Sequence, residues 1–189
     1  MKISASALLN LSPQILYAYG TNKEDGRPNF GLFSWINGYF DQEMGMMVCL
    51  SGDKITKDRI RATKIFSASL ITEEMLPFAD YLGFTEGFDD NKMTIPVEVL
   101  IGNVVGVPIL AKSPWAYELE VDRTIELDGG GIFLCKIRNV VADEFFCDET
   151  VSLEQRMNTV RPALSAGETY FNWDGTAPGN WQSLMTQIR

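Results

Sequence analysis

Two side chains at the end of a strand-like segment could hold a flat ligand. The segment 26–35, GRPNFGLFSW, alternates poorly between polar and apolar residues, which indicates that both of its faces are occupied. It ends in Ser34 and Trp35, so that a hydroxyl group stands beside a large aromatic plane. This ending is unusual for a strand that serves only as core.

A phosphate site is predicted by the segment MMVCLSGDKIT at 46–56. After an expected turn it reads as a second strand up to Ser51, then as a polar loop that opens a helix. Lys54 and Thr56 stand at the helix start, where outward N–H groups attract phosphate. A flat aromatic ligand with a phosphate group would fit between the two segments. From local sequence alone, these same hydroxyl and amine side chains are more typical of turns and helix caps than of a ligand site.

Composition excludes several classes of function. The chain has 189 residues, of which 46% are hydrophobic, enough for one domain with a buried core. A net charge of −9 without clustered Lys and Arg argues against nucleic acid and anionic membranes. The opening residues MKISASALLNL are too short and too interrupted for a signal peptide, and no apolar run approaches the roughly 20 residues of a membrane span. We therefore expect a cytoplasmic protein.

The chain has three cysteines and no histidine. Cys49, Cys135 and Cys147 lack CxxC spacing and stand among apolar or strand-like neighbours, which favours a reducing compartment over a disulfide frame. Without histidine we expect no metal site and no Ser-His or Cys-His nucleophile. If the protein is an enzyme, its chemistry belongs to a cofactor.

Alternating residues predict a mainly β protein with antiparallel strands. Residues 115–122 place large apolar side chains at every second position, the pattern of a half-buried strand. Residues 65–71 and 131–142 read similarly, and the second is long enough to bend or carry a bulge. Asp25-Gly26 predicts a hairpin turn. The glycines 129–131 lack G-x-G-x-x-G spacing and favour another turn over a dinucleotide loop.

Helices are expected to be few and short. One is predicted over 73–82, with Pro77 delaying or kinking its start and Gly83 ending it. Ser152 and Gln155 have the spacing of a capping box, which predicts a second helix after Ser152. A third is expected close to the C-terminus. The tail before it is rich in Gly, Pro and aromatic residues, which suits wrapping over a surface.

The order of these segments resembles the flavin reductase-like family of FMN-binding split barrels, whose electron-carrying members are the flavoredoxins. The matching segments run from Pro13 to about Tyr170: PQILYAYGT, GRPNFGLFSW, MMVCLS, a helix, IFSASLI, a loop with FDDNK, WAYELEVD and GIFLCKI. The resemblance implies an antiparallel split β-barrel of Greek-key type with a few short helices. It also implies that residues 1–189 form a single domain.

The resemblance implies FMN as cofactor and assigns residues to it. In related proteins, hydroxyl groups and backbone amides at the ends of these strands hold the phosphate and ribityl chain. The implied set is Asn29, Phe33, Ser34, Trp35, Cys49, Leu50, Ser51, Lys54, Thr56 and Lys92. The backbone of Cys49, rather than its thiol, would line the flavin. Lys92 stands where the family often has a lysine near this site, and a plain surface lysine is an equal alternative.

The resemblance further implies an oxidoreductase that reduces flavin with NADH or NADPH. Two other functions stay open: a flavoredoxin-like electron carrier, whose acidic surface would steer redox partners, and a barrel that binds another small ligand instead of flavin. Family members often carry a histidine where this chain has the glycines 129–131. Hydride transfer needs positioning rather than acid–base chemistry. Open half-shells of this kind imply a homodimer with FMN at the seam.

Overall fold

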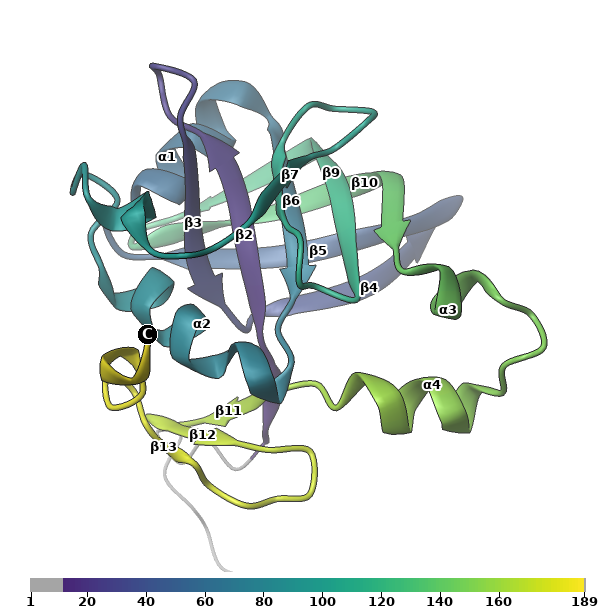
Figure 1. Cartoon of the computed structure of the whole chain (residues 1–189). Coiled ribbons are helices and arrows are strands. Elements are labelled where there is room, and N and C mark those ends of the chain that lie inside the picture. Colours follow the sequence, from purple (N-terminus) through teal and green to yellow (C-terminus); the bar gives the residue numbers. More distant parts are fainter. Residues whose placement is uncertain (1–11, 189) are drawn as a thin grey trace, which may run out of the picture.

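The computed structural model describes residues 12–188 and consists mainly of antiparallel strands (Figure 1). Seven strands form the largest sheet, in the order β3–β2–β6–β9–β10–β5–β4. These strands are β2 (Tyr17–Asn22), β3 (Pro28–Phe33), β4 (Ile36–Asp41), β5 (Glu43–Ser51), β6 (Ile65–Leu70), β9 (Trp115–Leu127) and β10 (Gly130–Ala142). The predicted mainly β, antiparallel fold is confirmed. The opening residues, judged too short and too interrupted for a signal peptide, lie outside the described residues.

Smaller elements surround this sheet. A four-stranded sheet is formed by β1 (Gln14–Ile15), β11 (Leu164–Ala166), β12 (Thr169–Phe171) and β13 (Gly179–Asn180), and a hairpin by β7 (Val99–Ile101) and β8 (Pro108–Leu110). The α-helices are α1 (Ile55–Thr63), α2 (Leu76–Phe84), α3 (Glu144–Cys147) and α4 (Leu153–Val160). Short 3-10 turns are η1 (Glu73–Met75), η2 (Lys92–Thr94) and η3 (Met185–Gln187). Within residues 12–188, no helix has the length and apolar character that a membrane crossing requires.

The two edge strands of the large sheet are joined by only two residues. β3 ends at Phe33 and β4 begins at Ile36, although five strands lie between them in the sheet. In a flat sheet with strands about 4.8 Å apart, the edges would be roughly 29 Å from each other. Three Cα steps span at most about 11 Å. The sheet therefore curls, and its opposite edges approach each other at Ser34 and Trp35 (Figure 1).

The prediction of a simple turn between residues 26–35 and 46–56 is wrong, because β4 lies there. β4 pairs with β5 through a tight turn at Gln42, which has a φ of 64°. Most residues of β4 are exposed, so its sequence INGYFD lacks the alternation that marks a half-buried strand. As a result, β3 and β5 are not partners within one hairpin. They lie on the two sides of the seam where the sheet edges approach.

Two clusters of buried side chains stabilise this arrangement. One cluster includes Phe66 of β6 and Phe133 of β10 and is formed mostly by buried side chains from strands of the large sheet. The other includes Phe30 of β3, Leu82 of α2 and Tyr170 of β12. The second cluster therefore fixes both α2 and the C-terminal segment against the edge of the sheet.

The helix predictions are confirmed except at two places. α2 starts one residue before Pro77, after a 3-10 turn, as the proline predicted. It continues through Gly83, where a Cβ would lie 2.8 Å from Leu32 Cβ, so glycine lets α2 approach β3 rather than ending the helix. The capping box is present: Ser152 Oγ accepts from the backbone N–H of Gln155 at 3.2 Å. The expected C-terminal helix is only the 3-10 turn η3.

The predicted bulge and turn of the long hairpin are confirmed. The pairing of β9 with β10 shifts register after Leu134 and again after Ile137. Asp128 and Gly129 form the turn between these strands, whereas Gly130 and Gly131 already belong to β10. A Cβ on Gly130 would lie 2.1 Å from the carbonyl oxygen of Leu50, so the close approach of β10 to β5 excludes any side chain, histidine included.

Candidate functional site

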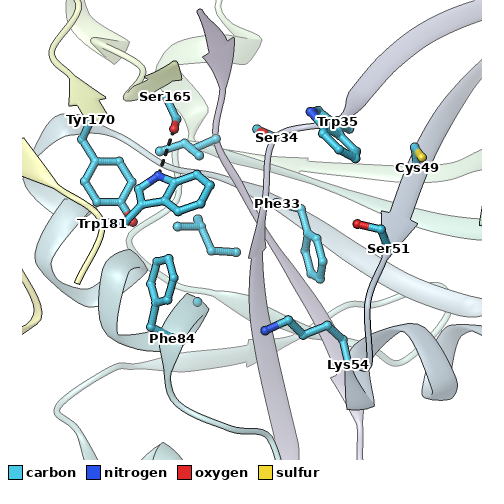
Figure 2. Close-up of a pocket in the computed structure, with 13 residues that line it drawn as sticks. Phe33, Ser34, Trp35, Cys49, Ser51, Lys54, Phe84, Ser165, Tyr170 and Trp181 are labelled. Atoms are coloured by element: carbon cyan, nitrogen blue, oxygen red, sulfur yellow. Dashed lines mark hydrogen bonds between the residues drawn. The ribbon is translucent and has the colours of Figure 1, made fainter. Parts of the chain in front are cut away.

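A cleft of about 300 Å³ opens at the seam of the large sheet (Figure 2). Its lining comes from β3, β5, the start of α1, α2 and the C-terminal segment. The predicted residues that line it are Phe33, Ser34, Trp35, Cys49, Ser51 and Lys54. The structure thus brings together the ends of the two segments that sequence alone singled out. The hydroxyl groups of Ser34 and Ser51 lie at this cleft.

A smaller hollow adjoins the cleft and shares Phe33 and Lys54 with it. The other predicted residues of this hollow are Asn29, Thr56 and Lys92. Lys92 is therefore not a plain surface lysine. Nine of the ten predicted residues thus line one space or the other.

Leu50 and the backbone of Cys49 depart from the prediction. Leu50 is buried in the core cluster and lines neither space, because alternation along β5 turns its side chain inward. The backbone N–H of Cys49 donates to the carbonyl oxygen of Trp35 at 3.0 Å, so this amide is already bonded. Cys49 contributes its side chain to the cleft instead.

Lys92 is a buried residue whose ammonium nitrogen reaches the hollow and has no bonded partner among residues 12–188. Only 3% of the residue is exposed, and no hydrogen bond or ion pair from residues 12–188 reaches its Nζ atom. Burial, assisted by the neighbouring charges of Lys54 and Lys23 and opposed by Glu86, lowers the pKa of Lys92 to about 8. A buried ammonium group is stabilised when an anion pairs with it. The hollow therefore favours an anionic ligand.

Neutral groups beside Lys92 also have unused bonding capacity. Asn29 Nδ2 donates to Thr56 Oγ1 at 3.0 Å and ties β3 to α1, whereas Asn29 Oδ1 is buried and accepts no bond from a described residue. At the cap of α1, Lys54 makes no side-chain cap bond, and the first backbone bond of the helix runs from Asp58 N–H to Lys54 oxygen at 3.1 Å. The preceding N–H groups are left available for an anion.

An aromatic wall, formed by Phe84, Tyr170 and Trp181, closes the other side of the cleft (Figure 2). The ring centroids of Phe84 and Trp181 are 5.6 Å apart, with the planes inclined by 46°. Trp181 Nε1 donates to Ser165 Oγ at 3.2 Å. No sequence pattern predicted this wall, because its residues come from α2 and from the tail. The aromatic content of the tail was the one available signal.

A buried carboxylate fixes the aromatic wall in place. Asp80 of α2 is fully buried and accepts the hydroxyl of Tyr170 at 2.7 Å. It also accepts the backbone N–H groups of Gln182, Leu184 and Met185, at 2.8, 2.9 and 3.0 Å. Burial and the contact with Asp80 raise the pKa of Tyr170. The C-terminal segment is thereby fastened to α2 just after Trp181.

A curled antiparallel sheet with a charged hollow and an aromatic cleft at its seam defines a β protein with a pocket of the kind that small-molecule sites have. Residues 10–153 match the family of flavin reductase like domains, and the chain belongs to this family. The match ends before the C-terminal segment, so Ser165, Tyr170 and Trp181 lie beyond it.

Individual relatives agree with this assignment. A protein of Aeropyrum pernix, itself uncharacterized, is 23% identical over 176 residues; the match covers 89% of this chain and 63% of that protein, so the chain spans less than two thirds of its length. The flavoredoxin of Desulfovibrio vulgaris (Miyazaki F) is 26% identical with a TM-score of 0.80, covering 91% of this chain and 93% of that one. The FMN-binding protein from Thermus thermophilus with bound 1-cyclohex-2-enone shares the fold, with 22% identity, a TM-score of 0.72 and coverage of 91% and 93%.

Proposed function

We propose that the chain is an FMN-binding oxidoreductase of the flavin reductase type. One observation carries the proposal: Lys92 is a buried charge without a partner, beside Lys54 and the open start of α1. A phosphate group would supply the opposite charge and accept bonds from these donors. FMN supplies hydride and electron chemistry when bound, whereas the residues of the chain bind and orient it.

The two adjoining spaces correspond to the two ends of FMN. The hollow at Lys92 and Thr56 would hold the phosphate group. The side of the cleft with the hydroxyl groups of Ser34 and Ser51 suits the polar edge of the flavin ring, with Phe33 as apolar surface. No second nucleotide motif is present in the sequence, so we propose FMN rather than FAD.

We also propose that the large sheet is a split barrel within one domain. The support is topological: β3 and β4 are the sheet's opposite edges, yet two residues join them. β3 and β4 do not pair with each other in the described residues, and the cleft lies at this seam. An open seam between two curled edges would be the place where the barrel is split.

Flavin content tests the proposal directly. The purified protein is incubated with excess FMN, FAD or riboflavin, separated from free flavin and denatured, and the released flavin is identified by chromatography. We expect FMN to be retained and to bind at least tenfold more tightly than riboflavin, because FMN, unlike riboflavin, carries a phosphate for the hollow. No retained flavin after incubation with FMN would refute the proposal. Lys54→Ala should weaken FMN binding without changing riboflavin binding.

NADH or NADPH is the proposed electron donor, and a flavoredoxin-like carrier is the second candidate. The carrier is favoured by the charges of the cleft: Lys54 is its one basic lining residue, and the FMN phosphate would use it. Anaerobic mixing of the FMN-loaded protein with each nicotinamide separates the two. A reductase bleaches the flavin within milliseconds to about a second. Inertness toward both nicotinamides, with rapid reduction by a low-potential donor, identifies the carrier.

We propose a homodimer in the cytoplasm. The outer face of β5, β10 and β9 carries apolar side chains that alternate with the core residues of these strands: Met47, Cys49, Ile125, Ile132 and Leu134. This face continues into the cleft at Cys49, so a second copy that covers it would also border the flavin site. Sedimentation at micromolar concentration tests this, and an FMN-loaded monomer would refute it. The cytoplasmic location rests on the three cysteines, which are all free.

A further inference from the structure

We propose that the aromatic wall at Trp181 is a second binding site of the cleft, for an uncharged planar ring compound that lies beside the proposed flavin. The inference rests on the proposed function, which places the flavin ring on the side of Ser34 and Ser51. The aromatic wall lies across the cleft from these hydroxyl groups (Figure 2). Once FMN is bound there, the wall stays available as a separate surface.

The polar atoms of the wall are already engaged with the protein. Trp181 Nε1 donates to Ser165 Oγ, and the hydroxyl of Tyr170 donates to Asp80. The neighbouring lining residues, Leu16 and Leu32, are apolar. The wall therefore offers flat apolar contact instead of hydrogen-bond donors. A ligand with a planar ring and few polar groups gains most from such a surface.

The charges around the wall also select an uncharged ligand. Asp80, the acidic group behind the wall, is fully buried and bonded to four donors. Among the described residues, Lys54 is the one basic residue that lines the cleft, and in the proposed function its ammonium group pairs with the FMN phosphate. A charged ligand at the wall would lose hydration without gaining a partner. The wall therefore favours a neutral ring over a charged one.

Trp181 is held rigidly although much of it is exposed. Its backbone N–H donates to the carbonyl oxygen of Glu168 at 2.8 Å, and the next residue, Gln182, donates to Asp80. The residue is nevertheless 40% exposed. An ordered aromatic side chain with an open face binds a ring at low entropic cost, because little motion is lost on binding.

Coumarin and coumarin-3-carboxylate test the site, since they share a planar ring system and differ in charge. Each is titrated by calorimetry into the oxidised, FMN-loaded protein, with no electron source present. We expect saturable binding of coumarin and at least tenfold weaker binding of the carboxylate. Equal affinities, or no binding of coumarin to FMN-loaded protein, would overturn the proposal. Displacement of FMN by coumarin would also overturn it, because the wall would then belong to the flavin ring.

Two tryptophans of the tail provide a matched pair of variants. Trp173 is 40% exposed, like Trp181, but does not line the cleft. Trp181→Ala should weaken coumarin binding at least tenfold, Trp181→Phe should restore most of it, and Trp173→Ala should leave it unchanged. FMN affinity, measured separately in each variant, should stay the same. Equal coumarin affinity in Trp181→Ala and Trp173→Ala would refute the site.

The same titration separates this inference from the flavin proposal. If the protein retains no FMN yet binds coumarin through Trp181, the flavin proposal fails and the ring site stands. If FMN is retained and coumarin does not bind, the ring site fails and the flavin proposal stands.

Discussion

Asp80 and Lys92 are both charged and almost fully buried, but their surroundings differ. Asp80 accepts four hydrogen bonds, from Tyr170 and from three backbone N–H groups of the C-terminal segment. Lys92 receives no such partner from residues 12–188. A buried charge with all its bonds made holds a structure together, whereas one without bonds lowers stability until a counter-ion arrives. The contrast assigns Asp80 to the architecture of the cleft and supports the proposal that Lys92 meets a ligand.

Neutral polar groups also differ between the two ends: those at the Asp80 end are bonded within the protein, whereas one at the Lys92 end is not. Beside Asp80, the hydroxyls of Tyr170 and Ser165 are bonded within the protein. Beside Lys92, the oxygen Asn29 Oδ1 is buried and unbonded among the described residues. One end of the cleft is therefore finished by the chain itself. In the proposed function, a bound phosphate completes the other end.

The largest effect is expected from Asp80→Ala. The variant leaves four donors without an acceptor in a buried place, so we expect the free energy of unfolding to fall by about 3–5 kcal/mol. Urea unfolding measures the loss. The matched control is Asp90→Ala, an exposed carboxylate paired with Arg27. The comparison fails if Asp80→Ala and Asp90→Ala lower the free energy of unfolding by the same amount.

Lys92→Met should stabilise the ligand-free protein but weaken FMN binding. It should raise the melting temperature of the ligand-free protein, because the cost of the unpaired charge is removed. It should weaken FMN binding by about 2 kcal/mol, or roughly 30-fold, and leave riboflavin binding unchanged. Calorimetry with both flavins and a thermal melt measure these effects. Lys112→Met, at an exposed lysine outside the cleft and the hollow, is the control. A melting temperature lowered by Lys92→Met would contradict the assignment.

The difference in unfolding free energy between the wild type and Lys92→Met, measured against pH, tests the same role of Lys92. The pKa of Lys92 is about 8 in the folded protein, below its ordinary value of 10.5. The unfolded chain therefore holds more protons between these values, and stability of the ligand-free protein should rise with pH across this window.

FMN affinity should change in the opposite sense, since a bound phosphate raises the pKa of Lys92 and binding then takes up a proton. Affinity should fall above pH 8, by at most about tenfold for each pH unit. Riboflavin affinity should show no such fall. A pH-independent difference between wild type and variant would be the contrary outcome.

The smallest effect is expected from Thr56→Val. Its hydroxyl accepts from Asn29 and lines the hollow, so its loss should weaken FMN binding about fivefold, near 1 kcal/mol. Thr63→Val serves as control on the same helix, because the Thr63 hydroxyl bonds only to nearby backbone oxygens. Equal FMN affinity in the two variants would remove Thr56 from the phosphate site.

Features that depend on neighbouring residues could be predicted from the sequence. The strand over 115–122 was found from its alternating large apolar residues, but the expected wet face is wrong, because Ala116 and Glu118 on that face are buried. The capping box at Ser152 needs only a residue three positions away. The seam residues Ser34 and Ser51 were found because each ends a recognisable strand. The strand β4 was not predicted, because its mostly exposed residues show no alternation of apolar and polar side chains.

Features that depend on distant contacts could not be predicted. The bond from Tyr170 to Asp80 joins residues 90 positions apart, so no local pattern indicates the aromatic wall. Lys92 stood undecided between surface and site for the same reason. Its burial comes from the fold around the hollow, which also contains residues of β3 and α1.

The strand order also has a consequence for synthesis of the chain on the ribosome. β5 pairs with β4 at once, but its other partner, β10, begins about 80 residues later. At about 5–20 residues per second, the β4–β5 hairpin waits for roughly 4–16 seconds with one edge unpaired. That hairpin carries Met46, Met47 and Val48, and an unpaired apolar edge recruits other chains. Faster elongation should therefore increase the share of newly made protein that escapes aggregation.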